Sequence, residues 1–82
     1  MEKSELQRRI CAGLPDAVVQ VDGDDGAHYQ ATVICDAFEG RRTLERHRMV
    51  YGALGAAVGT EIHALSLRTL TRSEAGESGG NT

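Results

Sequence analysis

The fold of this 82-residue chain is decided by two segments, Arg46-His47-Arg48-Met49-Val50-Tyr51 and Ile62-His63-Ala64-Leu65-Ser66-Leu67. The first lies in a stretch whose apolar residues recur at helical spacing, and the second alternates side chains as a strand does. A helix of about residues 43–58 is therefore expected to lead into a strand of about residues 62–70. Because a strand–helix–strand unit joins parallel neighbours by a right-handed crossover, we expect the strand before this helix to pair with the strand after it.

A further helix is expected near the start of the chain. Residues 4–7, Ser-Glu-Leu-Gln, have the pattern of a capping box, in which the first and last side chains bond each other's backbone amides. Leu6, Ile10 and Leu14 recur at helical spacing and share one face. A glycine and a proline then follow as stop signals. We therefore predict a helix over about residues 4–13.

Two strands are expected between the helices. Residues 16–22 and 28–35 both alternate apolar and polar side chains, which is the pattern of a half-buried strand. The intervening Gly23-Asp24-Asp25-Gly26 has the composition of a tight turn, so the two strands should form an antiparallel hairpin. The side chains expected to face the core are Ala17, Val19 and Val21 in the first strand, and Tyr29, Ala31, Val33 and Cys35 in the second.

The helix of residues 43–58 is expected to begin at Thr43, because threonine is a good N-cap residue. One face of this helix should turn toward the sheet. The candidates for that face are Leu44, His47, Tyr51, Leu54 and Val58. In the strand that follows, the residues expected on one side are His63, Leu65, Leu67 and Thr69.

Together these elements predict an α+β domain with the order α-β-β-α-β. The hairpin and the crossover imply a three-stranded mixed sheet with both helices packed on one face. From Ser73 onward the sequence consists almost entirely of polar residues and glycine, which bury too little apolar surface to offset the cost of ordering. We therefore predict a domain of residues 1–72 and a disordered tail of residues 73–82.

Length and composition narrow the classes of function. A chain this short forms one small domain with little room for a deep catalytic cleft, so we do not expect an enzyme. The net charge of −3 argues against a protein that coats nucleic acid non-specifically. The sequence has no signal-peptide pattern and no apolar run of about 18 residues, so we expect a cytoplasmic location without a membrane span. Cys11 and Cys35 are expected to be buried thiols in a reducing compartment.

The segments RHRMVYGALG, residues 46–55, and IHALSLRTLT, residues 62–71, resemble the signature of the BolA family. The resemblance runs from about Leu6 to Arg72 and implies a class II KH-like fold. It also implies an adaptor that binds a monothiol glutaredoxin and shares a [2Fe–2S] cluster, in iron–sulfur cluster trafficking or in iron and stress signalling. The segment VDGDDGAHYQA is closer to the acid-stress branch of the family, and RHRMVY is closer to its founding, morphogene-regulator branch.

His28 and His63 are the candidate metal ligands, since neutral imidazole binds iron, zinc or copper. From chemistry alone, two histidines this far apart in the sequence are weak evidence for a metal site, and one exposed loop histidine and one half-buried histidine are the more ordinary explanation. The resemblance implies that His63, in the IHAL segment, ligates the shared cluster and that His28 is the second ligand. It further implies that a glutaredoxin cysteine and the glutathione thiol complete the site. The isolated protein is then expected to be metal-free, and to be a monomer or a weak homodimer.

Four arginines form the alternative site. Arg41, Arg42, Arg46 and Arg48 lead into and along the helix of residues 43–58, and such residues contact either phosphate or an acidic partner. The alternative function is therefore a DNA-binding transcriptional regulator of stress or morphology genes, although a solvated helix face explains the arginines as well. His47 is interpreted as a helix-packing residue. The string Gly52-Ala53-Leu54-Gly55 falls inside the predicted helix, so it is not interpreted as the backbone clamp of a KH domain.

Overall fold

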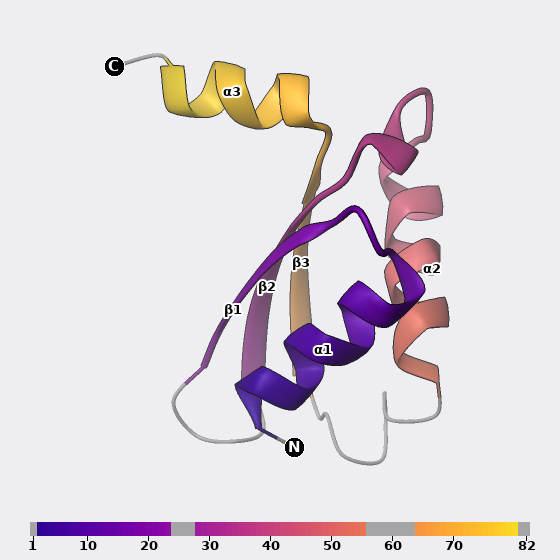
Figure 1. Ribbon diagram of the computed structural model, residues 1–82, viewed down its shortest axis with the longest axis vertical. Helices are drawn as coiled ribbons and strands as arrows, with labels where there is room; N and C mark the ends of the chain where they lie inside the picture. The colour runs from indigo at the N-terminus through magenta and orange to yellow at the C-terminus, as the bar shows by residue number, and fades with distance from the viewer. Residues whose placement is uncertain (1, 24–27, 56–63, 81–82) are drawn as a thin grey trace.

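A computed structural model describes residues 2–23, 28–55 and 64–80 of the chain (Figure 1). Three strands form a single sheet, and helices precede, interrupt and follow them. In chain order the elements are α1 (Lys3–Gly13), β1 (Val18–Asp22), β2 (His28–Ile34), the short 3-10 helix η1 (Asp36–Phe38), α2 (Thr43–Leu54), β3 (Ala64–Leu70) and α3 (Arg72–Gly80).

The sheet has the strand order β1-β2-β3. β1 and β2 are antiparallel, with Val18 opposite Ile34 and Asp22 opposite Gln30, as expected for a hairpin. β2 and β3 are parallel, with His28 opposite Ala64. This pairing confirms the predicted α+β fold with a three-stranded mixed sheet.

The hydrophobic core lies between one face of the sheet and the helices α1 and α2. Every second residue of β1 and β2 turns toward this core, and α1 and α2 both contribute to it, so the two helices cover the same face. Fully burying an aliphatic or aromatic side chain contributes about 1.5–3 kcal/mol, so this layer is the main source of stability. Its buried residues are Leu6, Ile10, Leu14, Val19, Tyr29, Ala31, Val33, Cys35, Phe38, Val50 and Leu54. The predicted apolar face of the first helix and the predicted faces of both hairpin strands are therefore confirmed.

The start of α1 differs from the expected capping box. The N-cap residue is Glu2 rather than Ser4, and no side chain caps the first turn. Ser4 lies inside the helix and is exposed. In place of the capping box, the Glu5 carboxylate forms ion pairs with Arg8 and Arg9, which lie one turn further along the same helix surface.

The orientation of α2 about its axis also differs from the prediction. Val50 and Leu54 are buried, whereas Leu44 and Tyr51 are 60% and 38% exposed, so the predicted apolar face was wrong at both of those positions. One turn before Val50, the inward face of α2 carries Arg46. Because this residue is charged, apolar spacing in the sequence did not identify the inward face correctly. The helix is capped at Arg42, whose backbone N–H donates to Glu45 Oε1 at 3.0 Å, and not at Thr43. The predicted core position Val58 lies outside the described residues.

The Arg46 side chain on α2 makes four hydrogen bonds to other described residues, and only 12% of it is exposed. Its Nη1 donates to Glu74 Oε1 at 2.7 Å and to the Thr69 carbonyl at 3.2 Å, and its Nη2 donates to Glu74 Oε2 at 3.2 Å. Its Nε donates to the Arg41 carbonyl at 3.0 Å, and the guanidinium carbon lies 5.8 Å from the centre of the buried Phe38 ring. A planar group that binds one carboxylate through two nitrogens has well-fixed geometry, so Arg46 joins α2 to the end of β3 and to α3.

Helix α3 occupies a segment for which the sequence predicted disorder from Ser73 onward. Its first turn is a capping box: the Glu74 N–H donates to Thr71 Oγ1 at 3.1 Å, and the Thr71 N–H donates to Glu74 Oε1 at 2.9 Å. Arg72 adds a bond from its Nη2 to the Asp16 carbonyl at 2.8 Å and an ion pair with Asp36. In Figure 1, α3 lies across the end of the sheet at which β3 finishes. Composition alone missed this helix because its start depends on polar contacts rather than on apolar burial. The division of the chain at residue 72 stays a prediction.

The contacts of Glu74 predict a pH-dependent contribution to stability. The bonds from Arg46 and from the Thr71 backbone lower the pKa of the Glu74 carboxyl from 4.5 to about 2. A carboxyl whose pKa is lower in the folded state contributes stability above its unfolded pKa and loses it as the pH falls toward its folded value. We therefore expect Glu74→Gln to lower the free energy of unfolding near neutral pH. The difference from the wild type should shrink between pH 4.5 and about 2, as measured by urea denaturation at several pH values.

Glu2→Gln is the matched control, because the Glu2 side chain makes no capping bond at the start of α1. We expect this variant to follow the wild-type pH profile. A Glu74→Gln protein that keeps the full wild-type dependence on pH between 4.5 and 2 would show that this contact contributes nothing in solution.

Candidate functional site

The face of the sheet opposite α1 and α2 carries the side chains that the core does not use. Alternation along the strands and the register between them place these residues in cross-strand rows. From one end of the sheet to the other, the rows are Val18–Ile34–Leu70, Gln20–Thr32–Arg68, Asp22–Gln30–Ser66 and His28–Ala64. This open face therefore changes from apolar to polar toward the end at which β2 begins.

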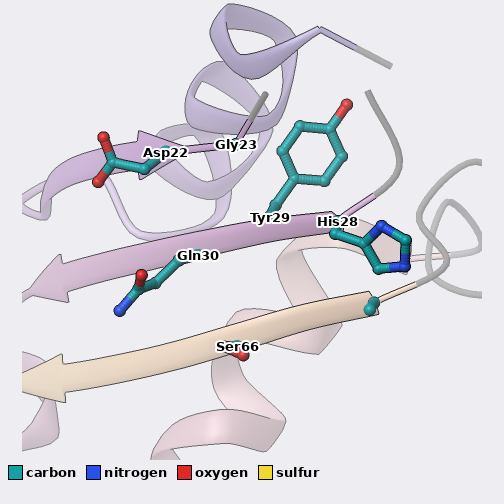
Figure 2. A pocket seen from close by; sticks show the side chains of 7 residues that line it. Asp22, Gly23, His28, Tyr29, Gln30 and Ser66 are labelled. Atoms are coloured by element: carbon teal, nitrogen blue, oxygen red, sulfur yellow. The ribbon is translucent and has the colours of Figure 1, made fainter. Parts of the chain in front are cut away.

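An open hollow of about 450 Å³ lies at this polar end, and Figure 2 shows the side chains around it. Tyr29 and Gln30 project to opposite sides of β2, so the hollow meets the edge of the core on one side and the open face on the other. The lining residues are Asp22, Gly23, His28, Tyr29, Gln30, Ala64 and Ser66. A carboxylate, an amide, a hydroxyl and an imidazole thus come from three strands to one place.

The candidate ligand His28 is the first residue of β2 and is exposed at the rim of this hollow. Its Cα pairs with that of Ala64, the first residue of β3. The second candidate ligand, His63, immediately precedes Ala64 in the sequence but lies outside the described residues. The structure thus places one member of the pair, and the pairing of the two histidines stays a prediction.

The position of His28 depends on Gly23, a residue that sequence reasoning assigned only to the turn. A Cβ atom added to Gly23 would lie 2.6 Å from the His28 carbonyl oxygen and 3.0 Å from Cδ1 of Tyr29. Real Cβ atoms essentially never approach another atom as closely as 2.6 Å. Glycine is therefore required here by the close approach of the two hairpin strands, and nothing in the turn composition revealed this.

The described residues do not form a complete metal site. No group of three or more His, Cys, Asp or Glu side chains within residues 2–23, 28–55 and 64–80 is placed to hold a metal ion. Both cysteines are free thiols: Cys35 is buried in the core as expected, and Cys11 is half-buried beside it. A cluster bound at the His28 end of the sheet would therefore need ligands from beyond the described part of the chain.

The four arginines of the alternative site separate into two groups. Arg41, Arg42 and Arg48 are exposed, the first two just before α2 begins and the third within it. Arg46 turns inward and bonds Glu74. Arg68, which the sequence analysis did not consider, adds an exposed cation on the open face of β3. His47 is half-buried, in keeping with a helix-packing residue.

Comparison with known proteins adds family information to this geometry. The family described as BolA-like protein matches residues 13–74. The DNA-binding transcriptional regulator BolA of Escherichia coli is 42% identical over 48 residues, and this match covers 58% of the chain and 46%, about half, of that relative's length. The acid stress protein IbaG of E. coli is 32% identical over 75 residues and covers 90% of the chain and 88% of the relative. The chain is therefore similar both to a relative of the founding BolA branch and to one of the acid-stress branch.

A solved structure gives the same result for the fold. The structure of a bolA protein homologue from Coxiella burnetii superposes with a TM-score of 0.83 at 42% identity, and it covers 92% of this chain and 96% of that one. Within the described ranges, each helix falls short of the length and apolar character that crossing a membrane requires.

The close approach at Gly23 predicts a local response to one added methyl group. Gly23→Ala should push the ends of β1 and β2 apart, so the amide resonances of His28 and Tyr29 should shift in a ¹H–¹⁵N spectrum, and stability should fall by about 1–3 kcal/mol, the usual cost of overpacking. Gly52→Ala on α2 is the matched control, because its added Cβ meets nothing within 4 Å. Unchanged resonances at the start of β2 in Gly23→Ala would contradict the steric argument.

Proposed function

This chain belongs to the BolA-like protein family, and from that premise we propose that it is a non-enzymatic adaptor that shares a [2Fe–2S] cluster with a monothiol glutaredoxin. It would serve iron–sulfur cluster trafficking or iron and stress signalling in the cytoplasm. The observation that supports the proposal most directly is the parallel register of β2 and β3. It pairs His28 with Ala64, the residue that follows the second candidate ligand in the sequence.

The ligand count explains why a partner is needed. A [2Fe–2S] cluster takes four protein or thiol ligands. His28 and His63 would supply two of them, and a glutaredoxin cysteine and the glutathione thiol would supply the other two. Cys35 is only 2% exposed in the core, so it is not available to complete the set.

The chemistry of imidazole ligands gives the shared site two properties. Replacing two thiolates by neutral imidazoles removes negative charge, which raises the reduction potential of such a cluster. A protonated imidazole cannot ligate, so mild acid should weaken the hold of His28 and His63. The exposed position of His28 on a strand end lets a partner approach it without rearranging the core.

A second candidate function is DNA-binding transcriptional regulation. It is favoured by the exposure of Arg41 and Arg42 just before α2 and of Arg48 within it, and one relative of the chain is named a DNA-binding transcriptional regulator. Exposed arginines bind phosphate without reading sequence, so on their own they account for affinity rather than for promoter choice.

Removing either histidine tests the adaptor function. Loss of an outer-shell partner typically lowers metal affinity by about 10–100-fold, so loss of a direct ligand should cost at least that much. We expect His63→Ala and His28→Ala each to reduce the yield and lifetime of the cluster in the reconstituted glutaredoxin complex. Visible absorption and circular dichroism under anaerobic conditions measure both quantities. Gln20→Ala changes an exposed residue of the open face that does not line the hollow, so it is the control and should leave the spectrum unchanged.

Two outcomes would count against the adaptor function. Wild-type spectra and lifetimes in both histidine variants would contradict it. A purified chain that carries a stoichiometric cluster without glutaredoxin would contradict the need for a partner.

A salt titration tests the regulator function. If the exposed arginines of α2 contact DNA phosphates, Arg42→Ala and Arg48→Ala should each weaken binding to all sequences and reduce the slope of log K against log salt by about 0.9. Unchanged titrations in both variants would remove this surface from a DNA footprint. Arg46→Ala is unsuitable for this test because it would also break the contacts with Glu74.

A further inference from the structure

The outer surface of α2 carries exposed apolar side chains that the core does not explain. Leu44 and Tyr51 are 60% and 38% exposed, and among the described residues the only other large apolar side chain this exposed is Val18 on β1. With 3.6 residues per turn, Leu44, Arg48 and Tyr51 fall at positions i, i+4 and i+7 of one helix face. These three residues form what we call the outer stripe, and it points away from the buried Val50 and Leu54.

Exposed arginines outnumber acidic residues around the outer stripe, where Glu45 is the exposed carboxylate nearest to Leu44 in the sequence. Arg48 lies between its two apolar members, and the exposed Arg41 lies in the segment that leads into α2, three residues before Leu44 in the sequence. Arg41 Nη1 lies 3.9 Å from Glu45 Oε2, and an exposed ion pair at this distance compensates the charge of Arg41 only weakly. In a chain with a net charge of −3, this surface is therefore locally cationic with an apolar centre.

Gly52 lies beside Tyr51 on the exposed surface of α2 and has no packing reason to be glycine. A Cβ atom added there would meet nothing within 4 Å, in contrast to Gly13 of α1, where it would lie 2.5 Å from Ala53 Cβ. Glycine inside a helix is destabilising relative to alanine. Within the described residues, Gly52 makes no contact that offsets this loss of helix stability. A partner that binds close to the helix backbone would offset it, because only glycine leaves room for such an approach.

From these observations we propose that the outer stripe is a docking surface for an acidic amphipathic helix of a partner protein. The apolar side chains of that helix would cover Leu44 and Tyr51, its Asp and Glu side chains would pair with Arg41 and Arg48, and its backbone would pass close to Gly52. A protein partner fits better than nucleic acid because the exposed leucine gives phosphate and sugar nothing to bind. The site is separate from the His28 end of the open face, since α2 covers the other face of the sheet.

The test uses a defined peptide and the full chain labelled with ¹⁵N. The peptide has about four helical turns, with leucine at positions i, i+4 and i+7, glutamate on both flanks and blocked ends. We expect amide shifts confined to α2. Leu44→Ser and Tyr51→Ser should each weaken the dissociation constant at least fivefold, and Val18→Ser, which changes an equally exposed apolar residue on β1, should leave it unchanged. Replacing the peptide's glutamates by glutamine should also weaken binding and remove most of its salt dependence.

Gly52→Ala separates docking from folding. Alanine should raise the thermal stability of the chain, because it favours the helix and meets open space, yet it should weaken peptide binding by crowding the approach to α2. A rise in stability together with unchanged peptide affinity would overturn the role of Gly52.

Three further outcomes would overturn the proposal itself. The first is the absence of shifts at α2, and the second is equal weakening by Val18→Ser and Tyr51→Ser. The third is a single-stranded oligonucleotide that displaces the peptide from the outer stripe at lower concentration, which would make this surface a nucleic-acid site. None of these readouts involves the cluster or the histidines, so they are independent of the adaptor function.

Discussion

The arrangement of helices around this small sheet depends on one side chain, Arg46. Its Nη1 and Nη2 donate to the Glu74 carboxylate, and its Nη1 and Nε donate to the backbone carbonyls of Thr69 and Arg41. The guanidinium lies over the ring of Phe38. These contacts connect α2 with the end of β3 and with α3, which are distant in sequence. Because a largely buried charge without partners is costly, Arg46 requires these hydrogen bonds in order to point inward. The turn of α2 about its axis, with Val50 and Leu54 inward, follows from this arrangement.

The inward position of Arg46 also gives the two arginines of this segment different roles. Arg48 is two residues further along, about 200° around the helix, so it must point outward when Arg46 points inward. The same rotation brings Leu44 and Tyr51 to the surface, where they lie on either side of Arg48. One segment therefore stabilises the fold through its first arginine and presents a cationic, partly apolar surface through its second.

Most of the sheet could be predicted from the sequence, whereas much of the detail around it could not. Alternation in residues 16–22 and 28–35 gave the hairpin and its buried face, because a strand has only two faces to choose between. A helix can rotate continuously, so the face of α2 could not be fixed by apolar spacing once a charged residue took an inward position. Thr71 and Glu74 match a capping-box pattern in the sequence. The Glu74 carboxylate of this capping box is also bonded by Arg46, which is 28 residues earlier in the chain, and the local pattern does not reveal that contact. The steric demand at Gly23 likewise arises between two strands and leaves no local signal.

The distribution of exposed groups follows from the size of the chain. A sheet of three strands has two faces, and α1 and α2 suffice to cover only one of them. A domain of about this length buries only about 60% of the surface of its unfolded chain, so the remaining face and the outer side of α2 stay accessible. Polar groups from all three strands then gather where β2 begins, while exposed arginines gather just before α2 and within it. Because the layer of core residues separates the two surfaces, a partner bound at one would leave the other open, so the two proposed binding surfaces could be occupied at the same time.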